Sequence, residues 1–248
     1  MIKFVENPNL PDNDVRVIIC GSDDKDVLSF FKENEIDVIK SKRNKFIDPA
    51  VSFHSDMAAI HLGNEKIVID KNQAELRSKL LSIGMSVTDT KHPIKGSYPC
   101  DVKLNFTLIG KTSVGCHRFA DEHFACEIDN FEKLNVKQGY CKCSVLVVDN
   151  NALITDDVSV SRIMSEKGFE CLLIQKGDVA LPGHEYGFIG GASGKISNNK
   201  IIFFGNIRNH RDFSAIENFL KKHSCTFVCT DEKALRDIGG IIPIIEAL

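Results

Sequence analysis

Short apolar runs separated by turn sequences recur along this chain at intervals of about 45 residues. Each run reads as a strand, a tight turn and a second strand, and four of them begin near His54, Pro99, Cys141 and Gly190. Turns rich in Asn, Asp and Gly between apolar runs, such as residues 149–151, are typical of β-hairpins. The pattern therefore predicts four hairpins that repeat one structural unit.

Amphipathic helices are predicted after three of these hairpins. Apolar side chains recur at helical spacing over residues 73–81, 158–166 and 213–221, and one further short strand follows each helix. The second repeat differs, because residues 116–135 lack clean helical spacing. Two aspartates stand at expected N-cap positions: Asp157 and Asp212.

The two ends of the chain together predict a fifth unit. Residues 15–20 read as a strand, 24–34 as a helix and 36–39 as a second strand, but the first strand of the unit is missing. The apolar segment 237–244 could supply it. The ends would then close a ring of five ββαβ units, which is an α/β propeller with a central channel. This arrangement would make residues 1–248 a single domain.

Composition and charge favour an ordinary globular protein. The chain is 43% hydrophobic and 26% charged, and its formal net charge of −3 gives no support to a nucleic-acid partner. No apolar run approaches the length of a membrane span, and the N-terminus lacks a signal-peptide pattern, so a cytoplasmic location without a membrane partner is expected. The nine cysteines are odd in number, so a disulfide framework is not expected. The sequence leaves the oligomeric state open.

A histidine, two aspartates and two cysteines are the candidate chemical groups. His54 and Asp56 are two residues apart at the head of a predicted strand, where alternate side chains share one face. If the ring closes, equivalent positions in the units bring them to one channel mouth with Asp101, Cys141 and Cys143. A thiol near an imidazole is the minimum for nucleophilic catalysis by a thiolate, and a carboxylate could bind a guanidinium by charge-assisted hydrogen bonds.

Each of these residues also has a structural explanation. A histidine at a strand end, aspartates that accept from nearby backbone amides and cysteines in the core would occupy the same positions. A zinc site made by Cys141 and Cys143 with Cys100, His54 or His117 is a further alternative, but C-x-C on a strand lacks the C-x-x-C spacing of zinc knuckles. No metal and no other cofactor is therefore expected.

Two stretches of the chain carry a family resemblance. One is His-Ser-Asp at residues 54–56, and the other is residues 131–146, in which Gly139 precedes Cys143 with G-x-x-x-C spacing. They resemble the H-x-D strand and the cysteine segment of the pentein superfamily, the guanidino-group-modifying enzymes such as arginine deiminase and dimethylarginine dimethylaminohydrolase. The resemblance implies five ββαβ units in a ring, with His54 catalytic and Cys143 as the nucleophile.

The Gly-Gly unit departs from the family pattern. In the family, carboxylates that bind the guanidinium usually lie beside a Gly-Gly-Asp element, whereas residues 189–192 read Ile-Gly-Gly-Ala with no flanking acid. The nearest candidates are His184, Glu185 and Asp237, and the loop that carries Glu185 could line a pocket. The residues expected to bind substrate are Asp56, Asp101, Cys141 and Glu185.

The sequence thus predicts a cysteine-dependent hydrolase or transferase. Its substrate would be a small cationic molecule, and a guanidino or amidino C–N bond would be cleaved through a covalent thiol intermediate. The alternative is a non-catalytic pentein that binds a partner, similar to the ribosome anti-association factor of archaea and eukaryotes, or a small-molecule binder with a degenerate active site. The His54/Cys143 pair favours the enzyme, and the missing acid favours the binding protein.

Overall fold

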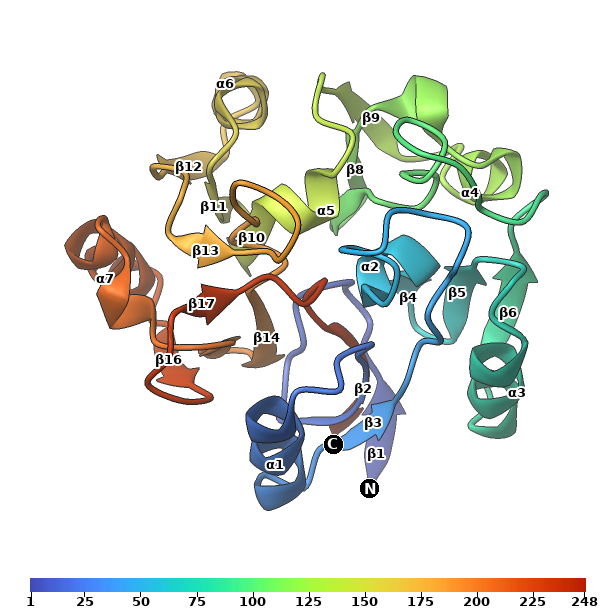
Figure 1. Ribbon diagram of the computed structural model, residues 1–248, viewed down its shortest axis with the longest axis horizontal. Coiled ribbons are helices and arrows are strands. Elements are labelled where there is room, and N and C mark those ends of the chain that lie inside the picture. Colours follow the sequence, from blue (N-terminus) through green and yellow to red (C-terminus); the bar gives the residue numbers. More distant parts are fainter.

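Five small sheets surround a common centre in the computed structural model, which describes residues 1–248 (Figure 1). In each sheet an antiparallel pair of strands leads into a helix, and a third strand then pairs in parallel with the second. The five sheets are not hydrogen-bonded to one another, so the strands form no single closed sheet. A short two-stranded sheet pairs β13 (Val179–Ala180) with β17 (Leu235–Arg236).

The four units expected from the hairpin pattern are all present, but their first strands begin three to eight residues later than predicted. The first contains β4 (Ala59–Gly63), β5 (Lys66–Ile69), α3 (Ala74–Ser82) and β6 (Ser86–Asp89). The second contains β7 (Thr107–Ile109), β8 (Thr112–Gly115), α4 (Glu122–Glu127) and β9 (Glu132–Asn135). The third contains β10 (Val145–Asp149), β11 (Ala152–Thr155), α6 (Val158–Glu166) and β12 (Glu170–Leu173). The fourth contains β14 (Ser193–Ser197), β15 (Lys200–Phe203), the 3₁₀ turn η2 (Ile207–Asn209), α7 (Phe213–Lys222) and β16 (Thr226–Cys229).

The helices predicted from apolar spacing are confirmed, and one of the two expected N-caps is also confirmed. The Asp157 carboxylate accepts the backbone N–H groups of Ser159 and Val160 at the start of α6. Asp212 occupies the same position before α7, but its side chain makes no cap hydrogen bond. Only its predicted position is therefore confirmed, because the Asp212 carboxylate instead accepts the backbone N–H of Gln175 at 2.6 Å.

The second unit is more regular than its sequence predicted. The segment expected to lack helical order contains the 3₁₀ turn η1 (His117–Phe119) and α4. The Asp121 carboxylate caps α4 by accepting the backbone N–H groups of His123 and Phe124. A helix of only six residues shows little apolar periodicity, which explains why the sequence pattern did not reveal it.

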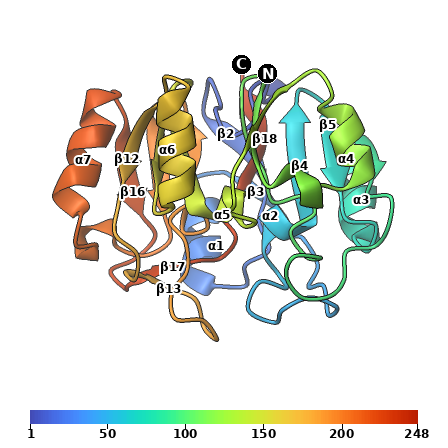
Figure 2. The same cartoon turned by 90° about the horizontal axis from the view of Figure 1, so that it is seen from above.

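The C-terminal strand completes a fifth unit with the N-terminal segment, as expected. β18 (Ile242–Ala247) runs antiparallel to both β2 (Val15–Ile19) and β1 (Ile2–Phe4), so the two ends of the chain lie side by side (Figure 2). The unit continues with α1 (Lys25–Glu33) and β3 (Asp37–Ile39). The strand begins later than the predicted segment 237–244, because Gly239 and Gly240 adopt positive φ in a loop before it.

Apolar packing joins each unit to its neighbours. Five buried clusters are present, and each contains side chains from two adjacent units. Phe203 of the fourth unit packs with Ile154 of the third, for example, while Ile244 of the fifth packs with Ile69 of the first. No unit therefore has a complete core of its own, and burial of apolar area couples all five.

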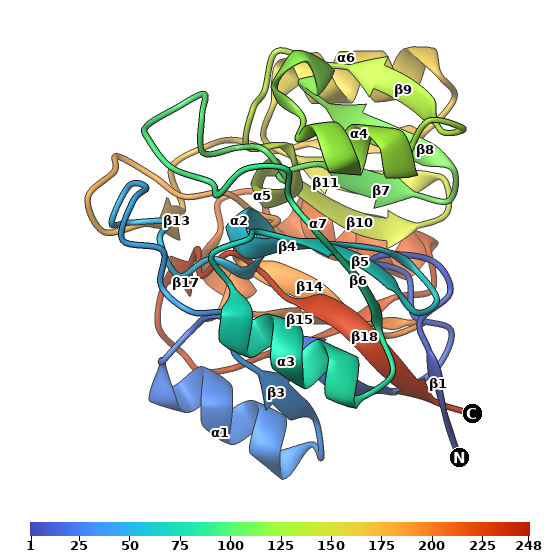
Figure 3. The same ribbon diagram turned by 90° about the vertical axis from the view of Figure 1, so that its right-hand side faces the viewer.

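Two one-turn helices lie at the end of the sheets where the candidate site residues are found. α2 (Ser55–Ala58) precedes β4, and α5 (Cys141–Ser144) precedes β10. Both lie toward the end opposite the chain termini (Figure 3). No helix of the structure is long and apolar enough to cross a membrane.

The buried carboxylate of Glu246, where the two ends of the chain meet, provides a test of the pairing between β18 and the N-terminal strands. Glu246 is fully buried, and its Oε2 accepts the backbone N–H of Asn13 at 2.7 Å while its Oε1 lies 3.3 Å from Lys3 Nζ. We expect Glu246→Ala to lower the free energy of unfolding by about 1–3 kcal/mol, since it leaves the Asn13 N–H without its acceptor. Urea unfolding followed by circular dichroism measures this loss.

The matched control is Glu75→Ala on α3. Glu75 also forms an ion pair, with Lys42 at 2.8 Å, but both side chains are exposed. The control should leave the unfolding midpoint almost unchanged, and an equal loss in both variants would contradict a special role for the buried junction.

Candidate active site

The two one-turn helices place the predicted catalytic pair. His54 directly precedes α2, Asp56 lies within α2 and Cys143 lies within α5. This differs from the expectation that His54 and Asp56 share one face of a strand, because β4 begins only at Ala59. Ser55 fixes the start of α2, since its hydroxyl donates to the carbonyl oxygens of residues 239 and 240 at 3.0 and 3.2 Å.

His54, Asp56 and Cys143 converge although they come from different units. A ring nitrogen of His54, a carboxylate oxygen of Asp56 and the Cys143 sulfur all lie within 4.8 Å of one another, and each residue is 1% exposed. The Cys143 thiol donates to Asp56 Oδ2 at 2.9 Å. The amide nitrogen of Asn105 lies 3.2 Å from the same sulfur, and its amide oxygen accepts the backbone N–H of Cys143. Asn105 therefore orients the thiol, and the sequence offered no signal for it.

Asp237 supplies a second carboxylate from the fifth unit. Its Oδ1 lies 3.6 Å from His54 Nδ1 and accepts the backbone N–H of Gly239 at 3.0 Å. Its Oδ2 accepts the backbone N–H of Phe188 at 2.9 Å. A Cβ on Gly191 would come within 1.9 Å of Asp237 Oδ1, so the carboxylate fills the space that this glycine leaves. The acid absent from the Gly-Gly segment thus reaches it from a distant part of the chain.

Several polar atoms at this point have no partner within the protein. Both ring nitrogens of His54 and Oδ1 of Asp56 are buried without a hydrogen bond. An unpaired buried polar group costs about 1–3 kcal/mol, so three in one place are unusual for a purely structural cluster. Together with the Cys143 sulfur, these atoms could bind a polar cationic ligand, and the same three residues could also hold a metal ion.

Burial and like charge shift the titration of the site. Burial raises the pKa of Asp56 to about 6, an effect that neighbouring Asp237 reinforces and His54 opposes. Burial also raises the pKa of the Cys143 thiol well above its usual range, and the charges of Asp56 and Asp237 add to this effect. At neutral pH the free protein therefore holds a protonated Cys143 thiol beside an ionised Asp56. A bound cation would reverse this balance.

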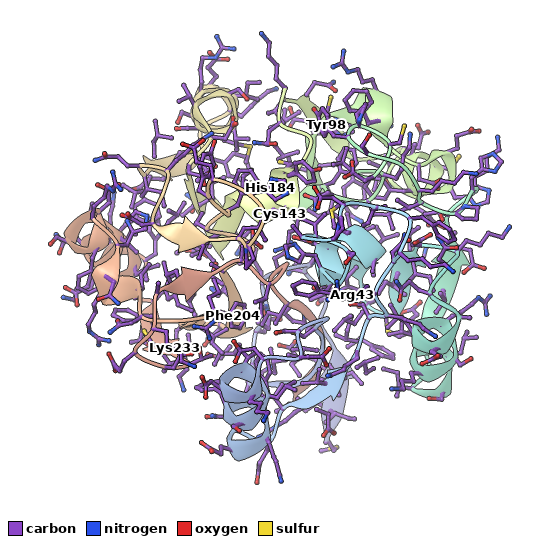
Figure 4. The ribbon with its side chains drawn as sticks, in the orientation of Figure 1. Arg43, Tyr98, Cys143, His184, Phe204 and Lys233 are labelled. Atoms are coloured by element: carbon purple, nitrogen blue, oxygen red, sulfur yellow. The ribbon has the colours of Figure 1, made fainter.

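A cavity of about 270 Å³ opens above the cluster. Among the nine residues that line it are Cys143, Asp237, His184 and Glu185, and none of the nine is lysine or arginine (Figure 4). His184 is held by a hydrogen bond between its Nε2 and Asp48 Oδ2 at 3.0 Å. The remaining lining is apolar or aromatic: Val51, Tyr140, Leu181, Tyr186 and Phe188.

Aromatic rings form one wall of the cavity. Phe188 stacks on Tyr140 with 6.3 Å between ring centroids and meets Tyr186 edge-on at 6.1 Å. The Tyr140 hydroxyl donates to Asp101 Oδ2 at 2.8 Å. Asp101 therefore lies behind the wall and not among the lining residues, so the structure places it as a support for Tyr140.

The two neighbouring cysteines have different surroundings. Cys141 packs in the apolar cluster between the second and third units, with its sulfur 3.8 Å from the Thr107 hydroxyl. Burial raises the pKa of Cys141 to about 12. It does not line the cavity, whereas Cys143 does. Of the residues considered for zinc, Cys100 is exposed and His117 bonds to Ser113 and Asn135, so neither joins the cluster.

Comparison with protein families gives one match by sequence. A family described as being of unknown function, DUF6873, matches residues 18–242. No sequence among curated proteins matches the chain.

Comparison with solved structures identifies the fold. SxtG, an amidinotransferase from Microseira wollei in the saxitoxin biosynthetic pathway, aligns with a TM-score of 0.59 and 9% identity over 95% of this chain and 96% of its own. Agmatine deiminase from C. jejuni aligns with a TM-score of 0.53 and 12% identity over 93% and 91%. Dimethylarginine dimethylaminohydrolase from Pseudomonas aeruginosa aligns with a TM-score of 0.56 and 9% identity over 88% and 92%. The resemblance to the pentein superfamily inferred from the two motifs is confirmed at the level of fold.

The raised pKa of Asp56 predicts a pH-dependent stability cost. The folded protein holds this proton more tightly than the unfolded chain, so stability falls as pH rises from about 4 through 6. We expect Asp56→Asn to raise the free energy of unfolding at pH 8 by at most about 3 kcal/mol, and to have little effect at pH 4. Denaturant unfolding at the two pH values measures the difference.

A control for the pH dependence is Asp89→Asn, which changes a half-buried carboxylate paired with Arg77. This variant should not gain stability at pH 8. A destabilised Asp56→Asn protein at pH 8 would show that the carboxylate supports the fold and is not strained within it.

Proposed function

The chain belongs to the DUF6873 family, and we propose that this member is a cysteine-dependent hydrolase or transferase that acts on a guanidino or amidino C–N bond. The observation that carries the proposal is the convergence of Cys143, His54, Asp56 and Asp237, of which Cys143 and Asp237 line the cavity. Proteins with the same fold include an amidinotransferase, an agmatine deiminase and a dimethylarginine dimethylaminohydrolase, which supports this class of reaction.

The proposal includes the architecture that brings these groups together. Residues 1–248 would form a single five-bladed α/β propeller of the pentein type, in which each ββαβ unit is a blade. Support comes from the shared strand order of the five sheets, from their arrangement around one centre and from the apolar clusters between neighbours (Figure 1). The pairing of β18 with β2 would complete the fifth blade from the two ends of the chain.

The substrate would be a small planar cation. Asp56 and Asp237 flank the thiol, and charge-assisted hydrogen bonds to a guanidinium would satisfy carboxylate oxygens that now lie buried beside each other. The rest of the molecule would lie against Tyr140, Phe188 and Leu181. No lysine or arginine lines this cavity, so it offers no permanently charged partner for a carboxylate on the substrate.

The chemistry would proceed in two steps. Cys143 passes its proton to Asp56, with which it already shares a hydrogen bond, and the sulfur attacks the central carbon of the cation. His54 donates a proton to the leaving amine as the C–N bond breaks, which leaves the amidino carbon bonded to sulfur. Water then adds to that carbon, the C–S bond breaks and the thiol is restored. An acceptor amine in place of water would give group transfer.

One observation favours the binding-protein alternative. The thiol is protonated in the free protein, because burial and two carboxylates raise its pKa. A protein that only binds cations would have the same feature. The two functions differ in whether ligand binding produces a thiolate, and the next experiments separate them.

Cation binding should lower the pKa of Cys143. We expect a pH titration of thiolate absorbance to show one thiol with a lower apparent pKa when agmatine is added, since the cation neutralises Asp56 and Asp237. The difference between wild type and Cys143→Ser isolates this thiol from the other eight cysteines. An unchanged titration in the presence of bound agmatine would support the binding protein.

Loss of the nucleophile should abolish turnover. With arginine, agmatine and methylated arginines as candidate substrates, Cys143→Ser should lose at least about 1,000-fold in turnover. Cys141→Ser is the matched control, because Cys141 is equally buried but lies outside the cavity, and it should retain activity. Equal activity of wild type and Cys143→Ser would exclude the proposed mechanism.

A further inference from the structure

A groove between the second and third units gathers positive charge away from the cavity. It has a volume of about 740 Å³, and three cations line it: Arg118, Lys137 and Arg162. Arg118 belongs to η1, Lys137 follows β9 and Arg162 lies on α6, so two neighbouring units contribute (Figure 1). The groove and the cavity above Cys143 share no lining residue.

None of these three side chains has an acidic partner. They form no ion pair and no hydrogen bond, although cations on the same elements are neutralised: Lys133 pairs with Asp129, and Lys167 pairs with Glu132. Arg118 lies over the Phe119 ring at 4.4 Å, which leaves the N–H groups at the edge of its guanidinium free to donate. Three unpaired cations therefore share one groove of a protein whose net charge is −3.

The nearest carboxylate does not offset this charge. Besides the buried Asp156, Asp157 is the only acid within two residues of any lining residue in the sequence. It already accepts the backbone N–H groups of Ser159 and Val160, the Ser159 hydroxyl and the Gln138 side-chain amide. Since Asp157 occupies the N-terminus of α6, a ligand anion would have to bind the side-chain cations and not the helix end.

The groove also has an apolar part. Val158 lies one turn before Arg162 on the same face of α6, and Ile163 and Val136 also line the groove. Val158 is 68% exposed, which is a large apolar exposure beside three charges. A ligand that matches both features would combine two or more negative charges with an apolar body.

We propose that this groove binds a small organic phosphate of nucleotide size. The phosphate groups would accept from Arg118 and Arg162, whose forked donors suit phosphate oxygens, and from the Lys137 ammonium. The apolar body of the ligand would cover Val158 and Ile163. The proposal is independent of the reaction at Cys143, because the two sites share no residue.

Calorimetric titration of the full chain tests this site. At 150 mM salt we expect ATP to bind, pyrophosphate to bind more weakly and adenosine, which is neutral, not to bind. Arg162→Gln and Lys137→Gln should each weaken ATP binding by about fivefold or more, and the Arg118→Gln/Arg162→Gln double variant should abolish it. Val158→Ser should weaken ATP binding but not pyrophosphate binding.

The matched control is Lys66→Gln, which removes an exposed, unpaired cation from β5 in the first unit. It should leave the affinity for ATP unchanged. Absence of binding of both ATP and pyrophosphate to the wild-type protein would overturn the proposal. Equal affinities in the wild type and a folded double variant would overturn it as well.

Discussion

The pairing of β18 with β2 is the contact on which both the fold and the site depend. It joins the ends of the chain, and it fixes the preceding loop, residues 237–240, against the first unit. A Cβ on Gly239 would meet His54 at 2.3 Å, so loop and histidine are in direct contact. Asp237 reaches His54 only through this arrangement. Without the pairing, the site would lose one of its two carboxylates.

The same contact brings like charges together in a buried place. Asp56 and Asp237 lie near a thiol, and their charges raise the pKa of Cys143 beyond what burial alone would do, while His54 opposes the effect of Asp237 on the pKa of Asp56. Such a cluster opposes folding, and the apolar clusters between neighbouring units offset its cost. A cation that binds between the carboxylates would relieve the repulsion. Substrate affinity and the stability cost of the free site would then have one physical origin.

Periodic features of the sequence predicted most of the architecture. Hairpins with Asn- and Gly-containing turns, helices with regular apolar spacing and an incomplete N-terminal unit all leave local signals, and the structure agrees with them. Asn105 leaves no such signal, because contacts between units set its place. Asp237 was one of three candidates for the missing acid, and a loop with positive-φ glycines sets its place. Asp101 was expected in the site, but the Tyr140 hydroxyl that binds it is recognisable only in three dimensions.

The one-turn helix α5 explains why the two cysteines have different roles. The sequence predicted a strand at residues 141–144, and the structure has a helical turn there. On a strand, Cys141 and Cys143 would share one face, and both would point into the channel. In the helical turn of α5, residues two apart are separated by about 200° around the axis, so their side chains point in nearly opposite directions. Cys141 consequently packs in the core, and Cys143 lines the cavity. The short helix, and not the cysteine spacing itself, leaves a single thiol at the site.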